Sequence, residues 1–275
     1  KTGVRVAVDE HLVELAKEIR DYGAFWSGSS AGYCMRKNIF DRLGVTPTSI
    51  DARKQRVFEV GHIFHGWVQD ITKDIGVSIA QELRLKDSNW MVQGHFDDII
   101  RAATGLILYD YKTANSRSFT YKKGKPMSRY HQYQLGTYMS MIRRVVEGDK
   151  NVTVLKKDDD GLYNKNITDS FRKLIKSLDG LKESRILTIS KDDLRMDENQ
   201  LLWNGGLEDA VNEYWATINE YWNAKKIPTC TCAEHEGGFM AKDKYNPYYF
   251  QGESCSLRWY KLWKEGKAGE YLKEV

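Results

Sequence analysis

The stretch that decides the fold runs from Gly94 to Lys112 and reads GHFDDIIRAATGLILYDYK. Its two halves, 94–100 and 106–111, alternate and are rich in β-forming residues. The Thr-Gly pair at 104–105 between them is a turn signal. The pattern therefore predicts two neighbouring antiparallel strands joined as a hairpin.

In such a hairpin, Asp110 and Lys112 would project side by side, because residues two apart in a strand face the same side of the sheet. If the two strands pair, Asp97 comes alongside them. Two carboxylates suit a hard cation such as Mg²⁺ or Mn²⁺, which polarises a phosphoryl oxygen and lowers the pKa of a bound water. The ammonium group of Lys112 could orient or deprotonate that water. The set is the minimum for metal-dependent cleavage of a phosphodiester, although a D-x-K triplet alone is more often a solvated strand edge.

Two elements are predicted upstream of this hairpin. Residues 53–75 have the apolar spacing of a helix, which carries the segment Gly61-His62-Ile63-Phe64-His65. Residues 79–85 then read as a strand that contains Glu82. One histidine on a helix is more often structural than a ligand, so these residues gain meaning only from the order in which they occur.

A second helix is predicted downstream, over residues 130–146. Gln134 and Tyr138 lie four positions apart on it and so share one face. Gln134 could simply cap a buried carbonyl. Together with the hairpin and the upstream elements, however, it completes a set that chance rarely produces in one order.

The order resembles that of the PD-(D/E)XK nuclease superfamily, in the RecB-like exonuclease branch that includes CRISPR-adaptation-associated iron–sulfur nucleases and phage exonucleases. Four segments carry the resemblance: Gly61-x-x-x-His65, Gly94-x-x-Asp97, Asp110-Tyr111-Lys112 and Gln134-x-x-x-Tyr138. They span about residues 55–145, roughly a third of the chain. The resemblance implies a restriction-endonuclease-like core.

The resemblance also implies roles for individual residues. His62 lies on the same helix as His65 and is an alternative to it. The implied metal ligands are His65, Asp97, Asp110 and the backbone carbonyl of Tyr111. The implied catalytic residues are Asp97, Asp110, Lys112 as the catalytic lysine, and Glu82 as a further acid, whereas Gln134 and Tyr138 would contact DNA or steady the site.

The four cysteines are Cys34, Cys230, Cys232 and Cys255. Four thiolates make a complete ligand set for an iron–sulfur cluster or for Zn²⁺. In the RecB-like branch, members with one N-terminal and three C-terminal cysteines bind a 4Fe–4S cluster, and the placement here is similar, although one residue alone separates Cys230 from Cys232. His235 could replace one cysteine in a zinc site. Four unrelated reduced thiols are the other alternative.

Basic residues follow the strand that carries Asp110. Between Tyr111 and Val146 there are eight Lys or Arg and no Asp or Glu, whereas the whole chain has a net charge of +4. Tyrosines are interleaved with them, which favours a track for single-stranded nucleic acid over a solvated basic loop. The residues expected to contact DNA here are Lys122, Lys123, Lys125 and Arg129.

The composition bounds the fold. A chain of 275 residues that is 41% hydrophobic can bury one substantial core. We expect one α/β domain over 1–275: a mixed central β-sheet flanked by helices over about 51–200, and a helical, cysteine-clipped lobe from about 24–45 and 226–275. Later strands are expected near 151–155 and 185–189, and a helix near 207–225.

The chain shows no apolar run of membrane-spanning length and no signal-peptide pattern, so we expect no membrane partner and a cytoplasmic protein, bacterial or, if phage-encoded, in the host cytoplasm. The expected function is a Mg²⁺- or Mn²⁺-dependent DNA exonuclease acting on single strands or frayed ends, in recombination, repair, phage replication or CRISPR adaptation, with a 4Fe–4S cluster or alternatively Zn²⁺ at the cysteines. An endonuclease on the same core is an alternative. A DNA-binding module whose site no longer turns over is another, but the intact Asp97, Asp110 and Lys112 argue against it.

Overall fold

The computed structural model describes residues 3–15, 24–42, 52–226 and 228. The chain groups into two compact units, which are described separately. The larger unit consists of residues 24–32 and 60–217, and the smaller of residues 1–23, 33–59 and 218–275. Within the described ranges, no helix has both the length and the apolar character needed to cross a membrane.

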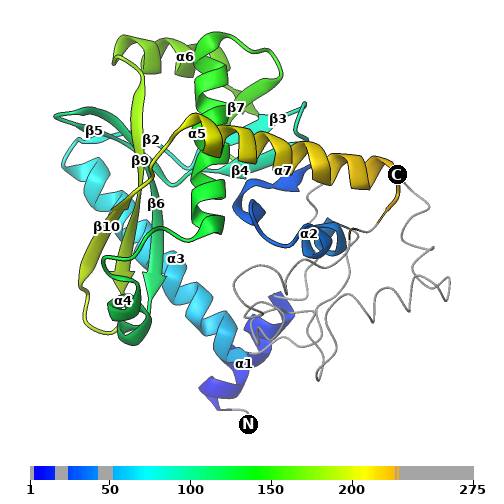
Figure 1. The fold of residues 1–275 in the computed structure, drawn as a ribbon. Helices are drawn as coiled ribbons and strands as arrows, with labels where there is room; N and C mark the ends of the chain where they lie inside the picture. Colours follow the sequence, from blue (N-terminus) through cyan, green and yellow to red (C-terminus); the bar gives the residue numbers. More distant parts are fainter. Residues whose placement is uncertain (1–2, 16–23, 43–51, 227, 229–275) are drawn as a thin grey trace. The chain divides into compact units, whose positions relative to one another are not determined.

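The larger unit contains two mixed β-sheets flanked by helices (Figure 1). Sheet A has the strand order β1 (Trp26–Ser27), β4 (Val92–His95), β3 (Arg84–Asp87), β7 (Val152–Lys156) and β8 (Lys165–Asn166). Sheet B has the order β10 (Met196–Gln200), β9 (Leu181–Ser190), β6 (Gly105–Ala114), β5 (Asp98–Ala102) and β2 (Ser78–Gln81). The helical segments of the larger unit are η1 (Gly28–Ser30), α4 (Ser116–Lys122), α5 (Arg129–Glu147), α6 (Thr168–Ser177), most of α3 (Ala52–Asp74) and most of α7 (Gly205–Asn223).

Strand β6 is central to sheet B. It pairs with β5 in antiparallel register, with Asp98 opposite Tyr109 and Ala102 opposite Gly105, which confirms the predicted hairpin. On its other edge β6 pairs in parallel with β9, from Leu106 to Ala114. The helices predicted over 53–75, 130–146 and 207–225 and the strands predicted near 151–155 and 185–189 are also confirmed.

Two predicted strands are interrupted, and this replaces the single central sheet that we expected with two. The run 94–100 divides into β4 in sheet A and β5 in sheet B, and the run 79–85 divides into β2 in sheet B and β3 in sheet A. Because β2 pairs with β5 and β3 with β4, the four strands form one antiparallel ribbon that bends as it leaves sheet B for sheet A.

The bend lies at Glu82 and Asp97. Glu82 has a positive φ of 50°, which breaks the extended conformation, and its N–H donates to the Asp97 carbonyl oxygen at 3.3 Å. Beside the bend, Phe96 is buried and its ring lies 6.3 Å from that of Phe171 on α6. The Phe96 side chain therefore anchors the turn in the core while Asp97 is left at the junction of the two sheets.

Helices α3 and α5 cover opposite faces of β6 (Figure 1). Successive residues of a strand point to opposite faces, so neighbouring residues of β6 contact different helices. Ile107, Tyr109 and Tyr111 pack with Val68 of α3 in one buried cluster. Asp110 points the other way and contacts α5 through a hydrogen bond from Gln134. The face that carries Asp110 is thus turned toward α5.

A fully buried carboxylate ties α3 to this sheet. Asp98 accepts hydrogen bonds from the hydroxyls of Thr72 at 2.7 Å, Ser78 at 2.6 Å and Tyr111 at 3.0 Å, and from the Gln81 amide at 3.0 Å. Four neutral donors satisfy its oxygens, so burial of the charge is offset by hydrogen bonds.

Helix α7 packs on α5 through its aromatic stripe. Val211, Tyr214 and Trp215 are buried, and the indole N–H of Trp215 donates to the hydroxyl of Thr137 at 3.0 Å. The stripe is therefore part of the core of the larger unit.

In the smaller unit, the described elements are α1 (Val4–Leu15), α2 (Met35–Arg42), the first turns of α3 and the end of α7. Arg56 of α3 forms an ion pair with Asp9 of α1. The Arg42 guanidinium lies 4.1 Å from the ring centroid of Trp222. Most of the expected cysteine-clipped lobe lies outside the described residues, so the predicted division of the chain stays a prediction.

Gly94 allows the Tyr138 ring to approach β4, which predicts the effect of Gly94→Ala. An added Cβ would lie 2.5 Å from the Tyr138 hydroxyl and 2.9 Å from a ring carbon. We expect Gly94→Ala to lower the free energy of unfolding by about 1–3 kcal/mol, measured by urea denaturation. Gly66→Ala is the matched control, because its Cβ meets nothing within 4 Å on helix α3 and should stabilise by about 0.5–1 kcal/mol. Equal unfolding midpoints for the two variants would contradict this packing.

Candidate active site

Asp110 is a buried carboxylate held between a cation and an amide. Its side chain is 4% exposed, and its Oδ2 lies 2.8 Å from the Lys112 Nζ. Its Oδ1 accepts a hydrogen bond from Gln134 Nε2 at 2.9 Å. Oδ2 is buried without a well-directed hydrogen bond, so Lys112 holds it through charge more than through geometry. The prediction that Asp110 and Lys112 lie side by side is confirmed.

Asp97 reaches the same strand from the bend of the ribbon. Its Oδ2 accepts a hydrogen bond from the backbone N–H of Tyr111 at 2.5 Å, one residue beyond Asp110. The N–H and C=O of a strand residue point toward the same edge, so the Tyr111 carbonyl also faces the edge at which Asp97 lies. The structure therefore places Asp97 and the Tyr111 carbonyl at one edge of β6.

Helix α3 supplies two further groups. The His65 Nδ1 lies 3.8 Å from the Asp97 Oδ2, and the His65 ring meets Tyr111 edge-on at 6.2 Å. Gln69 Nε2 donates to the Glu82 Oε1 at 2.7 Å and to the Asp97 carbonyl at 3.2 Å. The His62 side chain is exposed, so the structure favours His65 of the two predicted alternatives.

Burial and like charge dominate the electrostatics of this site. Burial raises the pKa of the Asp97 carboxyl well above its usual range, and repulsion from Asp110 raises it further, while Lys112 opposes the shift. Burial lowers the pKa of His65 to about 4, and the Lys112 cation adds to this effect. His65 is therefore neutral near pH 7, and the lone pair of its unprotonated ring nitrogen can bind a metal ion.

Gln134 and Tyr138 are buried beside Asp110. Tyr138 is 1% exposed and packs against Gly28 and Gly94. Burial, followed by the charge of Asp110, raises the pKa of its hydroxyl, and a hydrogen bond with Gln134 counteracts this. Of the two roles predicted for Gln134 and Tyr138, their burial favours steadying Asp110.

His131 and Gln69 are site residues that the sequence motifs did not reveal. His131 lies three positions before Gln134 on α5, and burial lowers its pKa to about 4, with the Lys112 cation as the next cause. The helical spacing of His131, Gln134 and Tyr138 along one face was the signal that could have identified it. Gln69 lies four positions after His65 on α3, the same spacing.

The basic segment after β6 presents cations next to tyrosines. The Lys125 Nζ lies 3.1 Å from the ring centroid of Tyr121, and Arg129 lies 4.9 Å from that of Tyr133 and donates to its hydroxyl at 3.1 Å. The remaining predicted contacts, Lys122 and Lys123, are exposed at the end of α4.

Of the predicted cysteine ligands, the structure describes Cys34 alone. Its side chain is half-buried, one residue before α2. Cys230, Cys232, Cys255 and His235 lie outside the described residues. The cluster therefore stays a prediction.

Among the described residues, no three His, Cys, Asp or Glu side chains are arranged as a group that could hold a metal ion. Lys112 and Gln134 engage the two oxygens of Asp110, and the Tyr111 N–H engages one oxygen of Asp97. The donor chemistry nevertheless fits a hard cation: two mutually repelling carboxylates, a backbone carbonyl and a neutral imidazole lie around this part of β6. Local rearrangement of the carboxyl groups would be needed for all of them to reach one ion.

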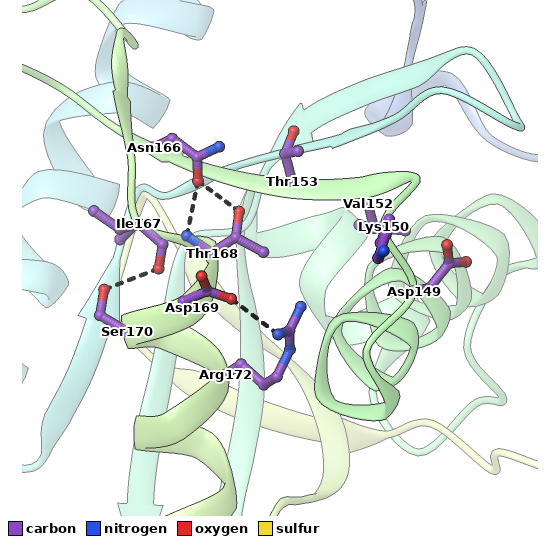
Figure 2. Close-up of a pocket in the computed structure, with 10 residues that line it drawn as sticks. All are labelled: Asp149, Lys150, Val152, Thr153, Asn166, Ile167, Thr168, Asp169, Ser170 and Arg172. Carbon is purple, nitrogen blue, oxygen red and sulfur yellow. Dashed lines mark hydrogen bonds and ion pairs between the residues drawn. The ribbon is translucent and has the colours of Figure 1, made fainter.

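A pocket of about 500 Å³ lies elsewhere in the larger unit, at the start of α6 (Figure 2). Its polar groups bind one another: Thr168 donates to Asn166 at 2.7 Å, and Arg172 donates to Asp169 at 2.9 Å. The lining residues are Asp149, Lys150, Val152, Thr153, Asn166, Ile167, Thr168, Asp169, Ser170 and Arg172. Because its acids and bases are balanced and none of the motif residues lines it, this pocket is not the candidate site.

The raised pKa of Asp97 predicts how stability depends on pH. A carboxyl whose pKa is higher in the folded state binds more protons there, so this group destabilises the fold as pH rises from its unfolded pKa of about 4 through its raised folded value. Asp97→Asn keeps an oxygen acceptor for the Tyr111 N–H but cannot ionise. Urea denaturation without divalent metal should show a smaller loss of stability between about pH 5 and 8 for this variant than for wild type.

Asp159→Asn is the control for this measurement, since Asp159 is exposed in a turn and its variant should follow the wild-type curve. Parallel pH curves for wild type and Asp97→Asn would contradict the buried, repelled carboxyl.

No protein-family model matches this chain. No curated protein matches it either. Among solved structures, the chain is similar to the one described as the crystal structure of SSO0001, with a TM-score of 0.45 and 13% sequence identity, over 86% of this chain and 98% of that chain.

Proposed function

We propose that this chain is a metal-dependent deoxyribonuclease with a restriction-endonuclease-like core of the PD-(D/E)XK type. The observation that carries the proposal is the ion pair between the buried Asp110 and the part-exposed Lys112, set beside a second carboxylate, Asp97, at the bend of the ribbon. Keeping two carboxylates close together and largely buried costs desolvation energy, and active sites are where proteins accept that cost.

The divalent cation, Mg²⁺ or Mn²⁺, would be held by His65, Asp97, Asp110 and the Tyr111 carbonyl. When bound there, it would supply Lewis acidity to the phosphate and lower the pKa of water. The protein's own groups prepare the site for it: Gln134 fixes the orientation of Asp110, and Gln69 fixes Glu82 against the bend.

Lys112 is the residue placed to act on the reacting groups. Its Nζ is held 2.8 Å from Asp110 on a side chain that is 29% exposed, so the ammonium stays accessible to a phosphate or to the attacking water. It would attract the scissile phosphate by charge and orient the water through its N–H donors. His131 on α5 is near enough for the Lys112 cation to add to the effect of burial in lowering the pKa of its imidazole.

Support for a DNA substrate comes from the segment that follows β6. Eight cationic residues and no acid lie between Tyr111 and Val146, and Lys125 and Arg129 each lie next to a tyrosine ring. Phosphates attract such a segment, and aromatic rings favour unpaired bases. We therefore propose an exonuclease acting on single strands or frayed ends, in recombination, repair, phage replication or CRISPR adaptation, in a bacterial cytoplasm or that of a phage host.

The same core supports an endonuclease, because the carboxylates and Lys112 determine the chemistry and not the requirement for an end. A DNA-binding module without turnover is a third possibility, which the close Asp110–Lys112 pair disfavours. Incubation with Mn²⁺ and end-labelled linear or closed circular single-stranded DNA separates them: an exonuclease degrades the linear form alone, an endonuclease both, and a silent module neither.

Cleavage should depend on the Asp110 carboxylate. Asp110→Asn keeps the shape and an acceptor for Gln134 but removes the charge that faces Lys112, so we expect cleavage of labelled DNA to fall by about 100-fold or more. DNA binding, measured separately by fluorescence anisotropy, should remain. Asp159→Asn, an exposed exchange of the same type, should cleave like wild type. Unchanged cleavage by Asp110→Asn would remove the proposed site.

We also propose that Cys34, Cys230, Cys232 and Cys255 hold a 4Fe–4S cluster, with Zn²⁺ as the alternative. Protein purified without oxygen should then show an absorbance shoulder near about 400 nm with matching iron and sulfide. Cys34→Ser should lose that shoulder and unfold at a lower temperature, because the cluster closes a long loop. Colourless wild-type protein with stoichiometric zinc would favour the alternative, and metal-free protein would contradict both.

A further inference from the structure

A second set of cations accompanies aromatic rings on sheet A. The Arg84 guanidinium lies 4.2 Å from the ring centroid of Tyr163, and the Lys157 Nζ lies 5.4 Å from the same centroid. The Lys86 Nζ lies 4.3 Å from the ring centroid of Phe25. None of these residues belongs to the four motif segments.

These side chains share one face of the sheet. In β3, Leu85 and Asp87 are buried, whereas Arg84 and Lys86 alternate with them and are half-buried. Their neighbour on β4 is His95, which is paired with Arg84 in the strand register. The buried face is the one that packs toward α5, so the Arg84 face is turned away from that helix.

Tyr163 and His95 form a platform with Arg84. Arg84 Nε donates to the His95 Nε2 at 3.0 Å, so this nitrogen is an acceptor and the imidazole is neutral. The His95 ring lies 4.4 Å from the Tyr163 ring at an interplanar angle of 31°. Groups on opposite faces of the Tyr163 ring would be too far apart for the 3.0 Å hydrogen bond between Arg84 and His95. The imidazole and the guanidinium therefore lie over the same face of Tyr163.

Among the residues that the structure describes, no acid is paired with the three cations of this face. Within the described part of the chain, no carboxylate oxygen lies within 4.0 Å of the side-chain nitrogens of Arg84, Lys86 or Lys157. Arg144 provides a contrast, because it forms ion pairs with Asp87 and Asp149. Unneutralised cations beside aromatic rings are the combination that recognises single-stranded nucleic acid, with cations for phosphates and rings for unpaired bases.

This face is continuous with the candidate active site. The Tyr163 hydroxyl donates to the backbone carbonyl of Glu82 at 2.9 Å. Arg84 follows Glu82 by two residues, and His95 precedes Asp97 by two. A nucleic-acid strand with one phosphate at Asp97 would therefore have the Tyr163 platform as its neighbour across the bend.

We propose that the outer face of sheet A, the Tyr163 face, binds the part of a single-stranded DNA that adjoins the scissile phosphate. Arg84, Lys86 and Lys157 pair with its phosphates, and an unpaired base stacks at Tyr163. The face is defined by Arg84, Lys86, His95, Lys157, Tyr163 and Phe25. This inference rests on the proposed nuclease function and adds to it a second track, on sheet A, besides the basic segment after β6.

The test measures binding in the Asp110→Asn protein, which should cut its ligand at least about 100-fold more slowly than wild type. Anisotropy of a fluorescein-labelled single-stranded oligonucleotide is titrated at several salt concentrations. Adding Lys157→Gln should weaken binding and reduce the slope of log affinity against log salt by about 1. Lys173→Gln, which removes an exposed lysine of α6, is the matched control and should leave affinity and slope unchanged.

The stacking role is tested at Tyr163. Tyr163→Leu should weaken binding by roughly 5- to 100-fold, whereas Tyr163→Phe, which keeps the ring and loses the bond to Glu82, should bind like the parent. Circular dichroism checks that each variant is folded. If a Tyr163 variant does not fold, the Lys157→Gln variant still tests the proposal, because Lys157 is exposed and its exchange should leave the fold intact.

The outcomes separate this inference from the function on which it rests. A parent that binds no DNA, together with a wild-type protein that cuts none, would overturn both. Cleaving wild type and a DNA-binding parent, with Lys157→Gln and Tyr163→Leu unchanged, would overturn the Tyr163 face alone. Equal affinity for duplex and single strand, with no effect of Tyr163→Leu, would overturn base stacking.

Discussion

One backbone hydrogen bond marks the constraint on which the candidate site depends. The Glu82 N–H bonds to the Asp97 carbonyl at the place where the ribbon of β2–β3 and β4–β5 leaves one sheet for the other. Because β5 begins only at Asp98, which pairs with Tyr109, the N–H of Tyr111 on β6 has no strand partner on that edge and binds the Asp97 carboxylate instead. The bend thus brings an acid to the edge of β6 and opens that edge at the same time.

The helices give this bend its polar lining. Gln69 bonds both sides of it, through the Glu82 side chain and the Asp97 carbonyl. From the opposite face of β6, Gln134 holds Asp110, while Gly94 and Gly28 leave room for the tyrosine behind it. Gln134 satisfies an oxygen of the buried Asp110, and Gln69 supplies donors to the part-buried Glu82 carboxylate and to the Asp97 carbonyl.

Local patterns predicted the parts of the site that lie within one element. The two-residue period of β6 placed Asp110 beside Lys112, and helical spacing placed Gln134 and Tyr138 on one face of their helix. What the pattern could not show was where a run of β-formers stops being one strand: neither Glu82 nor Asp97 is a glycine or proline, and the break depends on pairing with distant strands. The same holds for β6 and β9, whose parallel pairing joins residues about seventy-six positions apart, such as Asp110 and Ile186.

Asp97 and Asp98 are adjacent acids with opposite surroundings, and this has a consequence for helix α3. Asp98 accepts a hydrogen bond from Thr72 of α3, while the carbonyl of Asp97 accepts one from Gln69, three residues earlier on the same helix. His65 precedes Gln69 by one turn, and its Nδ1 lies 3.8 Å from the Asp97 Oδ2. Because α3 is bonded to two consecutive residues of one chain segment, a slide of the helix would break a hydrogen bond, and the same two bonds therefore set the distance between the imidazole and the carboxylate.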